Sequence, residues 1–232
     1  MPNYIAHEFF GERVFNRLSG HLRRAVEKDP EAYRSGLYGP DPLLFIPGGL
    51  IHSRRLHNHW RETTASTLQA MTEQGNAGEK SFAAGYLCHM VLDDFCHLWI
   101  HRWMDEQGLS HRALEVGLDW ILLEKAGEER FSVPKVEDRE RISRLAAQVI
   151  YPIRPLEYRM GLASMGALCS QMTNVAKLYR KKLNADYDEP LRALEKTMEQ
   201  AVDSAVMLLT HYTADELLRP RETLLEGLLQ PS

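Results

Sequence analysis

The chain of 232 residues contains only three cysteines, Cys88, Cys96 and Cys169. A small, odd number of cysteines excludes a disulfide framework, and we expect all three to be reduced and buried. No apolar run approaches the ~20 residues that a membrane-spanning helix needs. The start of the chain also lacks the basic region and continuous apolar stretch of a secretory signal. These absences predict a soluble protein of the cytoplasm, without a transmembrane segment.

Several familiar catalytic and binding signatures are also missing. The net charge of -4 and the lack of an extended basic region give no reason to expect a specific nucleic-acid partner. There is no Gly-x-Ser-x-Gly elbow and no Walker loop. No His-Asp dipeptide occurs, which argues against the HD-type phosphohydrolases, and no Glu-x-x-His pair occurs, which argues against ferritin-like di-iron bundles. Any catalytic site must therefore be built from other residues.

Apolar residues recur with helical spacing along most of the chain, and no strand pair is evident, so the predicted fold is all-α. We predict a single domain over residues 1–232, in which 1–125 hold a metal site and 126–232 add helices of unassigned role. The glycine- and proline-rich residues 35–49 are predicted as a loop, and 127–139 as a connector. The predicted helices cover residues 4–28, 51–72, 81–104, 110–125, 140–150, 156–183 and 189–212, and one or two short helices follow Thr213.

Histidines are concentrated in one part of the chain, where seven of the ten lie between His52 and His111. His89, Asp93 and His97 are spaced by four in an otherwise apolar segment. Four residues advance a helix by about 400°, so the three side chains share one face. Burying such groups without partners costs about 1–3 kcal/mol each, and a metal ion removes that cost. The alternative is a buried hydrogen-bonded network, but three ligand types in line favour a metal.

His111 and Glu115 repeat the spacing on the next predicted helix, and two neighbouring helices can direct such faces into one cavity. Asp41 lies between Pro40 and Pro42, in a stiff loop suited to presenting a carboxylate, although an aspartate there can also simply start a turn. A catalytic zinc usually takes three protein ligands and water, so the eight candidates imply at least two ions. The candidates are His7, Asp41, His57, His89, Asp93, His97, His111 and Glu115.

Imidazole and carboxylate ligands without cysteine suit zinc, and would also accept iron or manganese. Several divalent ions in one site favour phosphoester hydrolysis, because they lower the pKa of a bound water to about 7 and hold the phosphoryl oxygens. Two rival interpretations stay open. One is a non-catalytic helical protein that binds metal for structure, and the other is an iron or manganese enzyme that uses the same site.

The order and spacing of these motifs resemble the zinc-dependent phospholipase C family, which is related to the secreted single-strand-specific zinc nucleases. The motifs are His7, Gly39-Pro-Asp41-Pro, Arg55-Leu-His57, Tyr86-Leu-Cys-His89 with Asp93 and His97, and His111 with Glu115. The resemblance covers roughly residues 1–125 and is closest to a bacterial branch that looks intracellular. It implies a phosphodiester hydrolase in which a metal-bound hydroxide attacks phosphorus. The implied substrate is a phospholipid or a small phosphodiester.

The resemblance also implies a site of two or three zinc ions, with Asp93 shared by two of them. Asp41 would be the catalytic residue, as general base or by orienting the attacking water. The implied ligand sets are His57, His89 and Asp93 for one ion, His97, His111 and Glu115 for a second, and His7, Asp93 and the N-terminal amine and carbonyl for a third. Removal of Met1 would place the amine on Pro2. The alternative ligands are His52, His59 and His101, and the oligomeric state is not predicted.

Overall fold

A computed structural model describes residues 4–59, 64–71, 75–108, 110–130, 135–169, 171–183 and 188–211. The regular secondary structure in these ranges is helical, which confirms the predicted all-α fold. Within them, no helix combines the length and the apolar character that a bilayer crossing requires. The N-terminal amine and the tail predicted after Thr213 fall outside the described residues.

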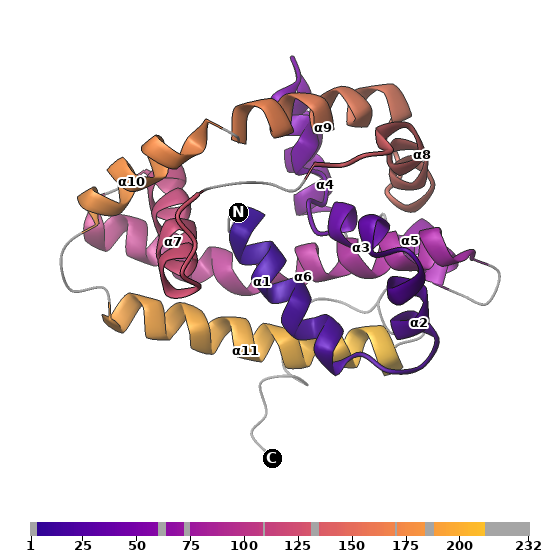
Figure 1. The fold of residues 1–232 in the computed structure, drawn as a ribbon, viewed down its shortest axis with the longest axis horizontal. Helices are drawn as coiled ribbons and strands as arrows, with labels where there is room; N and C mark the ends of the chain where they lie inside the picture. Colours follow the sequence, from indigo (N-terminus) through magenta and orange to yellow (C-terminus); the bar gives the residue numbers. More distant parts are fainter. Residues whose placement is uncertain are drawn as a thin grey trace.

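The long helix α6 (Ala77–Gln107) runs across the middle of the molecule, and the other helices surround it (Figure 1). Its start is fixed by a capping box: the Asn76 side chain accepts from the Glu79 amide, and the Glu79 carboxylate accepts from the Asn76 amide. Gly108, with a φ of 62°, ends it. The helix therefore extends beyond the predicted residues 81–104, because both caps lie outside the apolar stretch that sequence periodicity detects.

The N-terminal region is more broken than predicted. A single helix over residues 4–28 was wrong, because α1 (Tyr4–Arg17) and α2 (Gly20–Lys28) are separated at Ser19, and Gly20 has a φ of 67°. A helix missed in the sequence follows, α3 (Pro30–Gly36). Its cap is Asp29, whose carboxylate accepts a hydrogen bond from the Ala32 amide.

The predicted loop over residues 35–49 contains a short 3₁₀-helix, η1 (Asp41–Phe45), with Pro42 in its first turn. The predicted helix over residues 51–72 was also wrong as a single element. It is divided into α4 (Gly49–Asn58) and α5 (Thr64–Met71). Apolar spacing continues across the division, so periodicity alone gave no sign of it.

Five helices make up the described part of the chain after Gly108, and they lie on different sides of α6. These are α7 (His111–Lys125), capped by Ser110, α8 (Arg139–Val149), α9 (Pro155–Cys169), α10 (Met172–Lys182) and α11 (Asp188–His211). One helix over residues 156–183 was wrong, because α9 packs on η1 and α8 whereas α10 packs on α7. In Figure 1, α9 and α10 lie along the top and α11 along the bottom.

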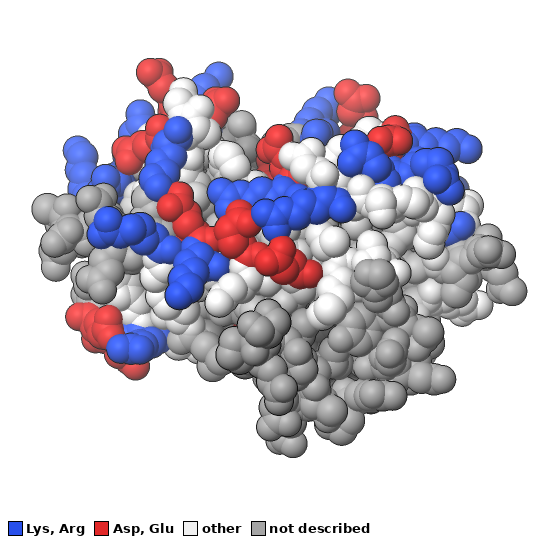
Figure 2. Space-filling model, turned by 90° about the horizontal axis from the view of Figure 1, so that it is seen from below, with Lys and Arg blue, Asp and Glu red and all other residues white. Residues whose placement is uncertain are grey.

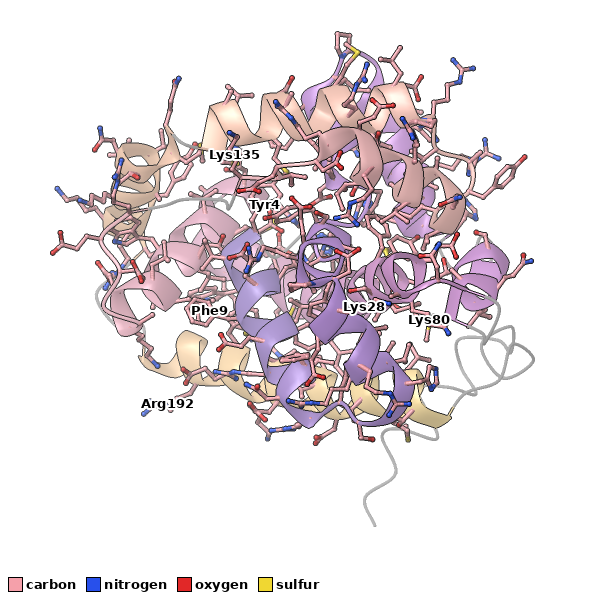
Figure 3. The ribbon with its side chains drawn as sticks, turned by 45° about the vertical axis from the view of Figure 1, so that its right-hand side comes forward. Tyr4, Phe9, Lys28, Lys80, Lys135 and Arg192 are labelled. Carbon is pink, nitrogen blue, oxygen red and sulfur yellow. The ribbon has the colours of Figure 1, made fainter. Side chains whose placement is uncertain are left out.

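The α11 side of the molecule carries interleaved charges of both signs (Figure 2). Ion pairs join α11 to α1: Arg13 to Glu199 at 2.8 Å, and Arg17 to Glu199 at 2.6 Å and to Asp203 at 2.7 Å. These pairs are solvent-exposed, so each contributes little to stability, about 0–1 kcal/mol. The first helix is nevertheless held between α11 outside and the core inside. In Figure 3, Tyr4 lies at the centre of the molecule, and Arg192 of α11 at its edge.

Candidate metal centre

The structure brings all eight predicted ligand candidates into three groups. The groups are His7 with His89 and Asp93, Asp41 with His57 and His89, and His97 with His111 and Glu115. Within each group, one ligand atom from every residue lies within 4.8 Å of the others. The side chains come from α1, η1, α4, α6 and α7, so segments far apart in sequence meet along one stretch of α6.

His57, His89 and Asp93 form the tightest arrangement. His57 Nε2 lies 3.1 Å from His89 Nε2 and 3.1 Å from Asp93 Oδ2, and His89 Nε2 lies 3.4 Å from the same oxygen. Ligand atoms about 2.0–2.1 Å from a tetrahedral zinc are separated from one another by roughly 3.3 Å. The three atoms thus have the spacing of zinc ligands.

The outer ring nitrogens of both histidines are bound to backbone carbonyls. His57 Nδ1 donates to the Ser53 carbonyl at 2.8 Å, and His89 Nδ1 donates to the Leu37 carbonyl at 3.0 Å. Because a carbonyl only accepts, each Nε2 is left to direct a lone pair at the other. The lone pairs of these two Nε2 atoms, 3.1 Å apart, repel each other unless a proton or a cation lies between them. This outer bonding is typical of metal-ligating histidines.

Asp41 faces the same arrangement from η1. Its Oδ1 lies 3.4 Å from His57 Nε2, and the residue is 1% exposed. Gly39, with a φ of 53°, allows the preceding turn to lie against the His89 ring: a Cβ there would be 2.3 Å from His89 Cδ2. The geometry therefore accommodates Asp41 as a fourth ligand as well as in the predicted role of general base.

Asp93 directs its two oxygens to different neighbours. Oδ2 faces His57 and His89, whereas Oδ1 lies 3.3 Å from His7 Nε2. The His7 ring is fully buried and stacks on the His89 ring, with centroids 4.1 Å apart. This is the arrangement expected of a carboxylate shared by two ions.

Buried polar atoms that lack hydrogen-bond partners indicate whether this cluster suits bound cations. Both nitrogens of His7 and both oxygens of Asp41 and Asp93 are buried without a hydrogen bond of acceptable geometry. Leaving a buried polar atom in that state costs about 1–3 kcal/mol. Each is an atom type that ligates zinc, so the donor set and its unmet bonding capacity fit bound zinc ions.

The third group lies further along α6 and on α7. His111 Nε2 is 2.6 Å from Glu115 Oε1, and the rings of His97 and His111 are 5.6 Å apart. Burial lowers the pKa of His97 and of His111 to about 4, so both imidazoles are neutral at pH 7 and can ligate. His101 is exposed, but its ring lies 5.3 Å from that of His111, which keeps it beside this group.

Burial and neighbouring charges shift the pKa values of the ionisable groups in the cluster in different directions. Burial raises the pKa of Asp41 and of Glu115 well above the usual range. Burial also acts to raise the pKa of Asp93, but the neighbouring imidazoles, His89 first, hold it well below its usual value. Burial acts to lower the pKa of His57, yet contact with Asp93 and the charge of Asp41 raise it to about 9. The raised pKa of His57 thus reflects the two carboxylates that its Nε2 faces.

The other sequence candidates lie outside these groups. His52 Nε2 contacts the Pro152 carbonyl at 2.8 Å, and His59 is exposed just beyond the end of α4. Asp119, a buried carboxylate on α7, supports the site through the backbone of α1. Its two oxygens accept from the Ile5 and Ala6 amides, each at 3.0 Å, and so cap the start of α1 from α7. This tertiary cap fixes His7, the next residue, and no sequence signal identified it.

Replacing Asp119 by asparagine is expected to weaken zinc binding roughly 10- to 100-fold, as for other groups that hold a ligand indirectly. The amide keeps one acceptor oxygen, and its NH₂ group then faces the second backbone N–H. Zinc affinity would be measured by chelator competition, together with hydrogen exchange at Ile5 and Ala6. Faster exchange at these amides with wild-type zinc affinity would show that the cap does not act on the metal centre.

A family model described as zinc dependent phospholipase C matches residues 6–189 of the chain. The match includes all eight predicted ligand candidates and continues through α10, beyond the residues over which the motifs were evident. No curated protein and no solved structure matches the chain.

Proposed function

The chain belongs to the zinc dependent phospholipase C family, and from this premise we propose that it is a zinc-dependent phosphoric diester hydrolase. The observation that carries the proposal is the convergence of imidazole and carboxylate groups from five elements, among which the buried nitrogens of His7 and oxygens of Asp41 and Asp93 have no hydrogen-bond partner. A phospholipid or a small phosphodiester is the proposed substrate. Zinc ions bound in this cluster would supply positive charge at the phosphoryl oxygens and lower the pKa of a bound water to about 7.

We assign the ligands from the three groups. His57, His89 and Asp93 would hold one ion, His97, His111 and Glu115 a second, and His7 with the other oxygen of Asp93 a third. The Ser53 and Leu37 carbonyls hold the His57 and His89 rings in the tautomer that leaves Nε2 for ligation. The low pKa of Asp93 keeps this shared carboxylate ionised at neutral pH. The positions of the His57 and His89 rings and the charge of Asp93 are thus fixed before any substrate binds.

Asp41 is proposed as the catalytic carboxylate, and one substitution tests both of its possible roles. Asp41→Asn should lower hydrolysis of a water-soluble chromogenic phosphodiester about 10²- to 10⁴-fold, the range expected when a general base is lost. If Asp41 instead ligates the first ion, zinc bound per chain falls together with activity. Unchanged activity in this variant would exclude both roles.

The same assay tests the metal. Activity should disappear after chelation and return with zinc. Recovery with iron or manganese but not with zinc would favour a different metalloenzyme, and no turnover in the zinc-loaded chain would favour a structural metal site.

We also propose that the protein acts in the cytoplasm. Cys88, Cys96 and Cys169 are free, buried thiols, as expected for a reducing compartment. Burial raises the pKa of Cys88 and of Cys169 to about 12, so these thiols are inert toward disulfide exchange.

A further inference from the structure

Large apolar side chains are exposed at the start of α4 and around the start of α9. We call this region the α4–α9 surface. Its members are Leu50 (48% exposed), Ile51 (79%), Tyr151 (68%), Leu156 (57%) and Met160 (49%). Several such side chains exposed together are typical of an interaction site.

The two parts of the α4–α9 surface are joined by a hydrogen bond. His52 Nε2 contacts the Pro152 carbonyl at 2.8 Å, so the residues that precede them, Ile51 and Tyr151, lie beside the same link. Leu156 and Met160 are four residues apart and therefore share one face of α9. In Figure 1, α4 and α9 cross near the top of the molecule. The exposed side chains thus belong to one surface.

A tight turn places the apolar end of α4 at the surface. Gly48 has a φ of 75°, and a Cβ on Gly49 would lie 1.8 Å from the Leu43 carbonyl oxygen, so only glycine fits there. Leu50 and Ile51 follow directly, exposed on the first turn of the helix. The exposed face of α4 then continues with Arg54 and Arg55.

The same elements border the proposed metal centre. His57 is on the last turn of α4. Helix α9 packs on η1 so closely that a Cβ on Gly161 would lie 2.2 Å from the Pro42 carbonyl oxygen, next to Asp41. The α4–α9 surface and the metal centre are therefore linked directly through α4 and through the contact of α9 with η1.

We propose that the α4–α9 surface binds the face of a phospholipid bilayer. The apolar side chains would enter the boundary between headgroups and acyl chains, and the arginines at its rim would meet lipid phosphates. Arg54 and Arg55 are exposed, and the Arg154 side chain is 83% exposed. The proposal rests on the proposed function, because it supplies the route by which a hydrolase of phosphodiesters reaches lipid substrates.

A second copy of the chain is a poorer occupant. A two-fold interface would bring the arginines of each copy onto the arginine-bearing surface of the other. The carboxylate at this surface, Glu157, already lies 3.6 Å from Arg154. Anionic lipid phosphates complement the arginines at this rim. The α11 side suits lipid phosphates less well, because its arginines are paired with carboxylates (Figure 2).

The test is co-sedimentation of the zinc-loaded full chain with vesicles of phosphatidylcholine and phosphatidylglycerol. A double variant, Ile51→Ser with Leu156→Ser, should lose at least about tenfold in vesicle affinity. Leu178→Ser is the matched control, because Leu178 is 54% exposed but lies on α10. Arg54→Gln and Arg55→Gln should each lower affinity about fivefold, and only for vesicles that contain the anionic lipid.

Hydrolysis of a water-soluble chromogenic phosphodiester separates this inference from the proposed function. The double variant should retain that activity, which also shows that it is folded. Equal vesicle affinity in the double variant and the wild type would overturn the lipid-surface proposal. So would wild-type association into dimers that the double variant abolishes, with no binding to vesicles. Vesicle binding without any hydrolysis would instead refute the proposed function alone.

Discussion

Asp93→Asn is expected to lower phosphodiester hydrolysis by more than about 100-fold and to reduce the zinc bound per chain. Removing a group that only orients a ligand costs 10- to 100-fold, so loss of a shared ligand should exceed that range. The amide has the same shape but carries no charge and has one acceptor oxygen, whereas both Asp93 oxygens are used. One lies 3.3 Å from His7 Nε2 and the other 3.1 Å from His57 Nε2.

The measurements are zinc per chain by mass spectrometry, and the thermal unfolding midpoint with and without zinc. Zinc should stabilise the wild type, because a ligand that binds only the folded state raises its stability, and should stabilise Asp93→Asn much less. Asp105→Asn is the matched control, since it makes the same change at an exposed position of the same helix. Full zinc occupancy and activity in Asp93→Asn would mean that the residue is not a ligand.

The sequence indicated which side chains lie together better than it indicated how they are arranged. Side chains four residues apart on a helix necessarily share a face, so His89 with Asp93, and His111 with Glu115, were identifiable from spacing alone. The ordered motifs then indicated His7, Asp41 and His57, because they lie in the pattern of the family. Those residues reach the site through tertiary packing, and no local rule states which of them meet.

Several interactions that support the site could not be predicted from the sequence, because they involve backbone carbonyls and amides. The carbonyls that fix the His57 and His89 rings belong to Ser53 and Leu37, and a carbonyl leaves no mark on residue identity. The tertiary cap that Asp119 gives to α1 spans more than one hundred residues. Helix division escaped detection for a related reason: apolar spacing continued across the breaks after Arg17, Asn58 and Cys169, where packing against different neighbours decided the outcome.

Gly85→Ala is expected to destabilise the fold by about 3 kcal/mol, at the upper end of the usual cost of overpacking. A Cβ at Gly85 would lie 2.1 Å from the Tyr33 carbonyl oxygen and 3.0 Å from the Gly36 Cα, so α3 and α6 meet backbone against backbone. No side chain can rotate to relieve such a clash. Urea unfolding of the metal-free protein measures the effect. Gly166→Ala is the control: a Cβ there meets nothing within 4 Å, so better helix propensity should stabilise by about 0.5–1 kcal/mol.

The same substitution should also weaken zinc binding, because α3 leads directly to the carbonyl that holds His89. Leu37 follows Gly36, and its oxygen accepts from His89 Nδ1 at 3.0 Å. Moving α3 outward lengthens that bond and frees the ring.

Gly36→Ala should have the same effects as Gly85→Ala, since its Cβ would lie 2.3 Å from the Phe82 carbonyl oxygen. Once one methyl group has separated the helices, the second needs little further movement, so the double variant should cost less than the sum of the two. Additive costs would place the two clashes at independent contacts, and unchanged zinc affinity would separate the helix contact from the metal centre.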